Sequence, residues 1–181
     1  GYRVGTLERT LGLRASETAT VHLDGVAVVP EAARGDPMAG FAQAMEALDL
    51  GRVGIAAQAL GVARAAMEHA VAYAVERRQF GRTLAEFGAT KAKVAEMHRR
   101  IAGARAMTHH AGTAVDATLH HGASRRGPDG ATAQAAAAKL TASETATWVA
   151  DEAVQIFGGY GYMREYPVAG CEGDGDLRRN E

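Results

Sequence analysis

The chain has 181 residues, of which 47% are apolar, so it is long and apolar enough to form a globular domain with its own core. Its 20 basic and 21 acidic residues give a formal net charge of -1, which argues against a nucleic acid or a membrane surface as partner. Cys171 is the only cysteine, which excludes an internal disulfide and a cysteine-rich metal site and fits a reducing, intracellular compartment.

The sequence contains no recognisable targeting or membrane segment. No basic segment precedes an apolar one at the N-terminus, and no apolar run reaches the roughly 18 residues that span a bilayer. We therefore expect a cytoplasmic protein whose partner is a small molecule or another protein. The chain begins at Gly1 rather than methionine, inside sequence that already reads as folded, so we expect a fragment of a longer protein.

The first 40 residues predict a short β segment followed by a linker. Residues 19–23 alternate apolar and polar side chains, and the alternation resumes at residues 26–28 after an Asp-Gly step. This pattern predicts two short strands separated by a turn or bulge. Two strands alone are only marginally stable, so we expect them to belong to a larger sheet. Residues 31–40, rich in Gly, Pro, Asp and Ala, are typical of a linker.

Three long helices are predicted after the linker. Apolar residues recur every three or four positions from Phe41 to Tyr73, with one spacing of seven, and again every three or four positions from Val94 to Val115. A third helix is predicted over residues 131–157. Long helices with short connections fold up and down on one another, and a fourth helix would close the bundle. Residues 163–181 are its expected place, although they are glycine-rich and acidic and show no helical stripe.

One position of the first apolar stripe is occupied by a charge. Arg52 lies between Leu48 and Ile55, and a guanidinium on the core side of a helix must be paired or face a cleft. Asp49, three residues earlier, is a possible partner within the helix. The sequence leaves two interpretations open: a structural Asp49–Arg52 pair, or a contact with a ligand.

Three arginines, Arg77, Arg78 and Arg82, surround Phe80 and Gly81 where the first helix is expected to end. Cations are favoured at a helix C-terminus, so these charges could form a solvated face. A guanidinium beside an aromatic ring and a glycine turn could equally clamp a pyrophosphate, because its fork donates to two oxygens at once.

The end of the third helix is also ambiguous. Gly158 and Gly159 could be an ordinary helix cap, but a cap does not explain the polar Gln155 one turn earlier or the glycines and tyrosines that follow. The histidine pairs at 109–110 and 120–121 do not converge with carboxylates on a rigid frame, so we expect no metal site.

Five strings in order along residues 10–168 resemble the acyl-CoA dehydrogenase family. The first two, residues 12–30 and 47–61, resemble the last strands of the family's middle β domain and the start of its C-terminal helical domain. The others are Glu76-Arg-Arg-Gln-Phe-Gly81, Ala153-Val-Gln-Ile-Phe-Gly-Gly-Tyr-Gly-Tyr162 and Glu165-Tyr-Pro-Val168. The resemblance implies a mainly α fold: an up-down helical bundle at 37–181, its last helix incomplete or altered, after the end of a truncated β domain at 1–36.

The resemblance also implies a function, the α,β-dehydrogenation of an acyl-CoA thioester, in which a carboxylate removes the α-proton and the β-hydride passes to FAD. Asp49 and Arg52 would line the acyl-CoA cleft. Family members form homodimers or homotetramers with FAD bound across a subunit boundary and pass electrons to an acceptor such as an electron transfer flavoprotein. The implied cofactor contacts are Arg77, Gln79, Phe80, Leu84 and Phe87 toward the FAD of a neighbouring subunit, and Gln155, Gly158 and Gly159 at the other end of the cofactor.

The tail departs from the family pattern. Most members carry the general base in a Glu-Gly-Thr string, whereas here Glu181 lies within about one position of that base and no Gly-Thr follows. Glu181 is therefore the candidate base. Two alternatives stay open: an inactive helical-bundle module that serves assembly, and a relative with another flavin reaction, such as an acyl-CoA oxidase or a flavin monooxygenase.

Overall fold

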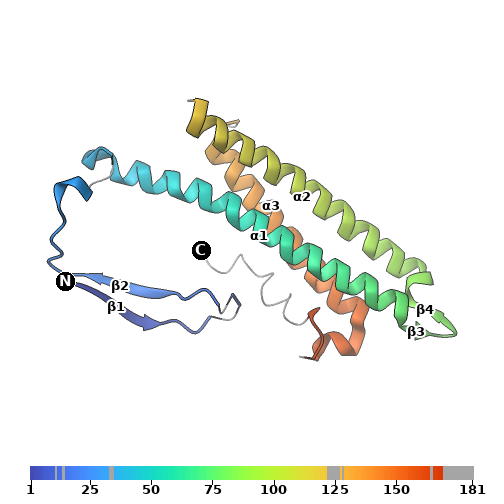
Figure 1. Cartoon of the computed structure of the whole chain (residues 1–181). Coiled ribbons are helices and arrows are strands. Elements are labelled where there is room, and N and C mark those ends of the chain that lie inside the picture. Colours follow the sequence, from blue (N-terminus) through green and yellow to red (C-terminus); the bar gives the residue numbers. More distant parts are fainter. Residues whose placement is uncertain are drawn as a thin grey trace. The chain divides into compact units, whose positions relative to one another are not determined.

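The computed structural model describes residues 1–10, 12–13, 15–32, 35–121, 127, 129–163 and 165–168 (Figure 1). The chain forms two compact units, Gly1–Ala47 and Leu48–Glu181, which are described separately. The predicted domain division after residue 36 stays a prediction.

The first unit contains an antiparallel strand pair. Strand β1 (Tyr2–Leu7) pairs with β2 (Ala19–Leu23) in a register that sets Tyr2 opposite Leu23, and short 3-10 helices follow at η1 (Pro30–Ala32) and η2 (Pro37–Ala39). The strand predicted at residues 26–28 is wrong. Residues 26–28 are exposed and belong to no strand, and Gly25, at a φ of 56°, turns the chain after β2.

The second unit is the helical bundle, and with it the predicted fold class, mainly α after a short β segment, is confirmed. Its long helices are α1 (Gly40–Glu76, which begins in the first unit), α2 (Gly88–His121) and α3 (Ala131–Phe157). Short elements lie between and after them: β3 (Arg78–Gln79), β4 (Arg82–Thr83), η3 (Leu84–Glu86) and η4 (Gly158–Tyr162). Most of the region predicted for a fourth helix lies outside the described residues. In the described part of the chain, no helix is both long and apolar enough to cross a membrane.

Alanines form the core of the bundle. The buried positions of α1 beyond residue 55 recur every three or four residues and are all alanine: Ala56, Ala59, Ala63, Ala66, Ala70 and Ala74. Both ends of α3 contact α1. The hydroxyl of Thr132, at the start of α3, donates a hydrogen bond to Asp49, and the ring of Phe157, at the end of α3, stacks on that of Tyr73. The helices α1 and α3 are therefore parallel, and α2 lies beside them in the opposite direction (Figure 1). Side chains this small let helix backbones approach closely.

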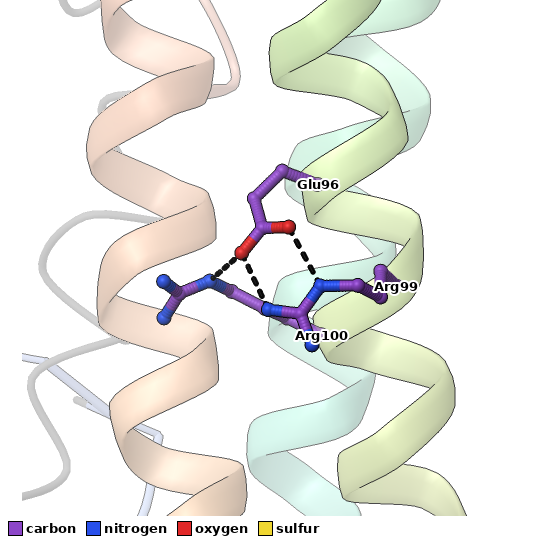
Figure 2. Close-up of polar contacts among 3 residues, drawn as sticks. All are labelled: Glu96, Arg99 and Arg100. Carbon is purple, nitrogen blue, oxygen red and sulfur yellow. Dashed lines mark hydrogen bonds and ion pairs between the residues drawn. The ribbon is translucent and has the colours of Figure 1, made fainter.

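Polar groups join α2 to α3 along one edge of this core. Lys93 of α2 forms an ion pair with Glu152 of α3, and the Arg100 guanidinium lies over the Trp148 ring at 4.2 Å from its centroid. Glu96 holds Arg100 in this position, because its carboxylate accepts from Arg100 Nε at 2.8 Å and from two nitrogens of Arg99 at 2.6 and 2.7 Å (Figure 2). Trp148 is the only tryptophan, so its fluorescence reports on this contact.

The two arginines lower the pKa of Glu96 to about 2 from an ordinary 4.5, chiefly through the Arg99 hydrogen bonds. Because the folded pKa is below the unfolded one, the stabilisation is complete above about pH 4.5 and is lost as the pH falls toward 2. We expect Glu96→Gln to be less stable than the wild type at pH 7 and nearly equal to it at pH 2, in urea unfolding followed by Trp148 fluorescence. Glu76→Gln, at another exposed carboxylate, is the control. A gap between wild type and Glu96→Gln that does not change with pH would contradict this account.

Candidate functional site

A tight hairpin follows α1. The Arg77 amide still donates to the Tyr73 carbonyl at 2.8 Å, and the Leu84 amide then donates to the Arg77 carbonyl at 2.9 Å, which closes the β3–β4 pair. The two turn residues, Phe80 and Gly81, have φ values of 52° and 80°. Positive φ at both central residues is the geometry that suits a two-residue hairpin, but a bulky residue rarely adopts it. The sequence predicted the helix end and the glycine turn, but not the hairpin.

Glycines end α3. Gly158 has a φ of 60°, and its amide donates to the carbonyls of Val154 and Gln155, so the predicted cap is formed. The following 3-10 helix folds back tightly, since a Cβ added to Gly161 would lie 2.7 Å from the Val154 carbonyl oxygen. A Cβ on Gly158 or Gly159 would meet no atom within 4 Å. The glycine run thus combines a cap, a tight turn and an open backbone surface.

The two helix ends meet at a cleft of about 550 Å³. Five of the eight residues predicted to bind a cofactor line it, although they come from two segments more than 70 residues apart: Arg77, Gln79, Leu84, Gly158 and Gly159. Within the described residues, no carboxylate lies within ion-pair distance of Arg77. An anionic group in the cleft would therefore meet a guanidinium that has no acidic partner in this part of the chain, beside a glycine backbone that leaves room for it.

The aromatic wall of the cleft was not predicted from the sequence. Tyr73, Phe157 and Tyr160 line it, and the rings of Tyr73 and Phe157 stack with centroids 4.1 Å apart. Tyr73 counted as a core position of the apolar stripe, yet it precedes Arg77 by one helical turn and so shares its face. Partial burial raises the pKa of Tyr73, and the nearby charge of Arg77 opposes the rise. Tyr73 could have been predicted as a cleft residue from its position four residues before Arg77, which was already a candidate.

Three other predicted cofactor residues are not part of this cleft. Phe80 is 93% exposed at the hairpin tip, with its ring 6.5 Å from that of Phe87. The Arg82 guanidinium covers Phe87 at 4.0 Å from the ring centroid. Gln155 is exposed on the last turn of α3. The candidate base Glu181 lies outside the described residues.

The Asp49–Arg52 pair forms near the other end of the bundle. Arg52 Nη1 donates to Asp49 Oδ1 at 2.9 Å, and the hydroxyl of Thr132 in α3 donates to Asp49 Oδ2 at 2.7 Å. The sequence placed Arg52 on the core side, but Asp49 is the buried member, at 2% exposure. The Arg52 side chain keeps 35% exposure, so it could also reach a ligand.

Residues 38–171 match the model of the family described as "Acyl-CoA dehydrogenase, C-terminal domain". An acyl-CoA dehydrogenase of Bacillus subtilis is 47% identical over 169 residues, which are 93% of this chain and 42% of that protein. The subunit CarC of a caffeyl-CoA reductase-Etf complex from Acetobacterium woodii is 36% identical over 168 residues, again 93% and 42%. This chain therefore spans about two fifths of the length of these relatives.

Solved structures of acyl-CoA dehydrogenases are also similar to this chain in fold. Butyryl-CoA dehydrogenase of Megasphaera elsdenii superposes with a TM-score of 0.88 at 40% identity, over 98% of this chain and 44% of that one. An acyl-CoA dehydrogenase from Bacillus anthracis, solved in complex with FAD, has a TM-score of 0.81 at 27% identity, over 99% of this chain and 32% of that one.

Because Asp49 is buried between two donors, removing its charge leaves the guanidinium of Arg52 without its counter-ion. We expect Asp49→Asn to lower the free energy of unfolding by about 1–3 kcal/mol, and Thr132→Val, which removes one hydrogen bond, by about 0.5–1.5 kcal/mol. Asp116→Asn, at an exposed position of α2, is the matched control. Urea unfolding followed by circular dichroism measures all three, and an Asp49→Asn variant as stable as Asp116→Asn would show that the pair does not hold α1 to α3.

Proposed function

The chain belongs to the acyl-CoA dehydrogenase family by its C-terminal domain, and from this membership we propose that it is part of an FAD-dependent enzyme that dehydrogenates an acyl-CoA thioester between Cα and Cβ. The observation that carries the proposal is the cleft, which gathers Arg77, Gln79 and Leu84 from the end of α1 with the Gly158-Gly159 backbone from the end of α3. These are residues that the family resemblance implies for FAD.

The chemistry of the cleft fits the phosphate part of FAD. The Arg77 fork can donate to two phosphate oxygens, and the Gln79 amide adds a further donor. A side chain at Gly158 or Gly159 would project into open space, which a bound ligand would otherwise take. Leu84 and the aromatic wall supply apolar contact for the rest of the ligand. When bound, FAD would supply the hydride acceptor.

At the other end of the bundle, Asp49 and Arg52 would border the acyl-CoA cleft. Asp49 is held by Arg52 and Thr132, so its role is to fix the direction of the Arg52 guanidinium rather than to move a proton. The general base is proposed to be Glu181, the carboxylate nearest to the position where most family members carry it.

The separation of the two regions supports a site shared between subunits. Asp49 and Arg77 are 28 positions apart on one helix and the turn that ends it, or about 40 Å at 1.5 Å per residue. Reacting atoms must come within about 3–3.5 Å of each other. We therefore propose a homodimer or homotetramer in which Arg77 of one subunit holds the FAD that serves the acyl-CoA cleft of another.

The proposed electron acceptor is an electron transfer flavoprotein. A relative at 36% identity is a subunit of a complex that contains an Etf, which supports this class of partner. The similarity to a butyryl-CoA dehydrogenase makes a short acyl chain the first substrate to test.

The first test of the function uses the protein produced from the whole gene. We expect bound FAD, and bleaching of its absorbance when butyryl-CoA is added without oxygen. Arg77→Ala should weaken FAD binding by about 10- to 100-fold, because it removes a charge-assisted contact. Arg64→Ala, at an exposed arginine of α1, is the control. A protein that binds no FAD would leave the assembly module as the better interpretation, and reoxidation by oxygen faster than by a dye would indicate an oxidase.

The second test concerns the shared site. Subunits carrying Arg52→Ala and subunits carrying Arg77→Ala should each have little activity alone when FAD is kept at a limiting concentration. If two subunits build each site, a mixed dimer contains one doubly altered site and one intact site, so random 1:1 mixing should restore about a quarter of wild-type activity. If one subunit supplies both residues, every site in every dimer keeps one defect and mixing restores nothing. Co-expression with two affinity tags isolates the mixed dimer.

A further inference from the structure

Four aromatic rings form a cluster beside Arg77, and three of them, Tyr73, Phe157 and Tyr160, line the cleft. Tyr73 of α1 stacks on Phe157 at the end of α3, and Tyr166 contacts this pair edge-on, with its centroid 5.7 Å from that of Phe157. Tyr160 of η4 then lies 5.3 Å from Tyr166, between centroids. Each ring is therefore held by a neighbour, and the cluster joins Tyr73 of α1 to three rings that lie within ten positions of one another at and after the end of α3.

Arg77 lies over the exposed end of this cluster. Its guanidinium carbon is 5.2 Å from the centroid of Tyr160, within the range of a cation–π contact. A free arginine side chain samples many rotamers, and fixing it reduces its entropy. The Tyr160 face offsets part of that loss before any ligand arrives. Among the described residues, the side chain of Arg77 donates no hydrogen bond to a protein acceptor, so its N–H groups are available to a ligand.

We propose that Tyr160 is a positioning residue: its ring face holds the Arg77 guanidinium in the cleft and so raises the affinity for the phosphate groups of FAD. The inference rests on the proposed function, because it assumes that Arg77 binds those phosphates. Tyr160 acts through the π face of its ring, and its hydroxyl is not required. The aromatic cluster is thus a support that limits the movement of the cationic side chain.

A double-mutant cycle on the whole protein, stripped of flavin, tests this mechanism. The readout is the dissociation constant for FAD from flavin fluorescence. Tyr160→Leu should weaken binding by about 3- to 30-fold in the wild-type background and leave it unchanged in an Arg77→Ala background. Tyr160→Phe, which keeps the ring face, should stay within about twofold of the wild type. Tyr162→Leu, at a 90% exposed neighbour, is the matched control.

A graded replacement keeps the test decisive if Tyr160→Leu does not fold. Replacing Tyr160 with phenylalanine carrying three fluorines preserves the shape of the ring and weakens its negative face, so FAD binding should fall below that of Tyr160→Phe. The inference is overturned if Tyr160→Leu weakens binding equally with and without Arg77, if fluorination has no effect, or if Tyr160→Phe binds as poorly as Tyr160→Leu. A wild-type protein that binds no FAD, or an Arg77→Ala variant that binds it normally, would instead overturn the proposed function.

Discussion

The burial of one face of α1 in the bundle is the constraint on which the rest of the structure depends. Every buried position of α1 beyond residue 55 is an alanine, and contacts between α1 and α3 fix what lies at each end of this face. At one end Thr132 reaches Asp49, and at the other Phe157 reaches Tyr73. Both candidate regions are consequences of one helix pairing. A larger residue in the alanine core would move them together.

The candidate site depends on how the helices end as much as on how they pack. Arg77 and Gln79 enter the cleft because α1 stops at Glu76 and turns into a hairpin. Gly158 and Gly159 line the cleft because α3 ends at Phe157 and the next residue, Gly158, has a positive φ that turns the chain. The bundle therefore brings the turn after α1 and the turn after α3 to one cleft, where the Arg77 guanidinium and the backbone of Gly158 and Gly159 are exposed. An anionic cofactor would contact both the guanidinium and this backbone.

The features of the structure that depend on local sequence patterns were predicted from the sequence. The bounds predicted for the third helix agree with α3, and a glycine stands just outside each end. Four of the five predicted residues that line the cleft belong to two of the strings that resemble the family, and Leu84 follows the first of these strings by three positions. The sequence did not predict the strand at Tyr2–Leu7, whose pairing with β2 depends on contacts across 11 intervening residues. The buried face of α1 was predicted only in part. Ala59, Ala66 and Ala70 of the predicted stripe are buried, whereas elsewhere the buried residue follows the larger apolar residue of the stripe by one position. Leu48 is 49% exposed and Asp49 is buried.

The stability of the isolated chain does not explain why residue 80 is a phenylalanine. Its left-handed backbone disfavours a side chain with a large Cβ substituent, and its ring lies almost wholly in water. Glycine or asparagine would relieve the backbone strain at that turn, and either would remove an exposed apolar surface. A design procedure that optimised the isolated subunit would discard the phenylalanine at once. The proposed contact of Phe80 with the FAD of a neighbouring subunit would give this ring a role that such a procedure does not include.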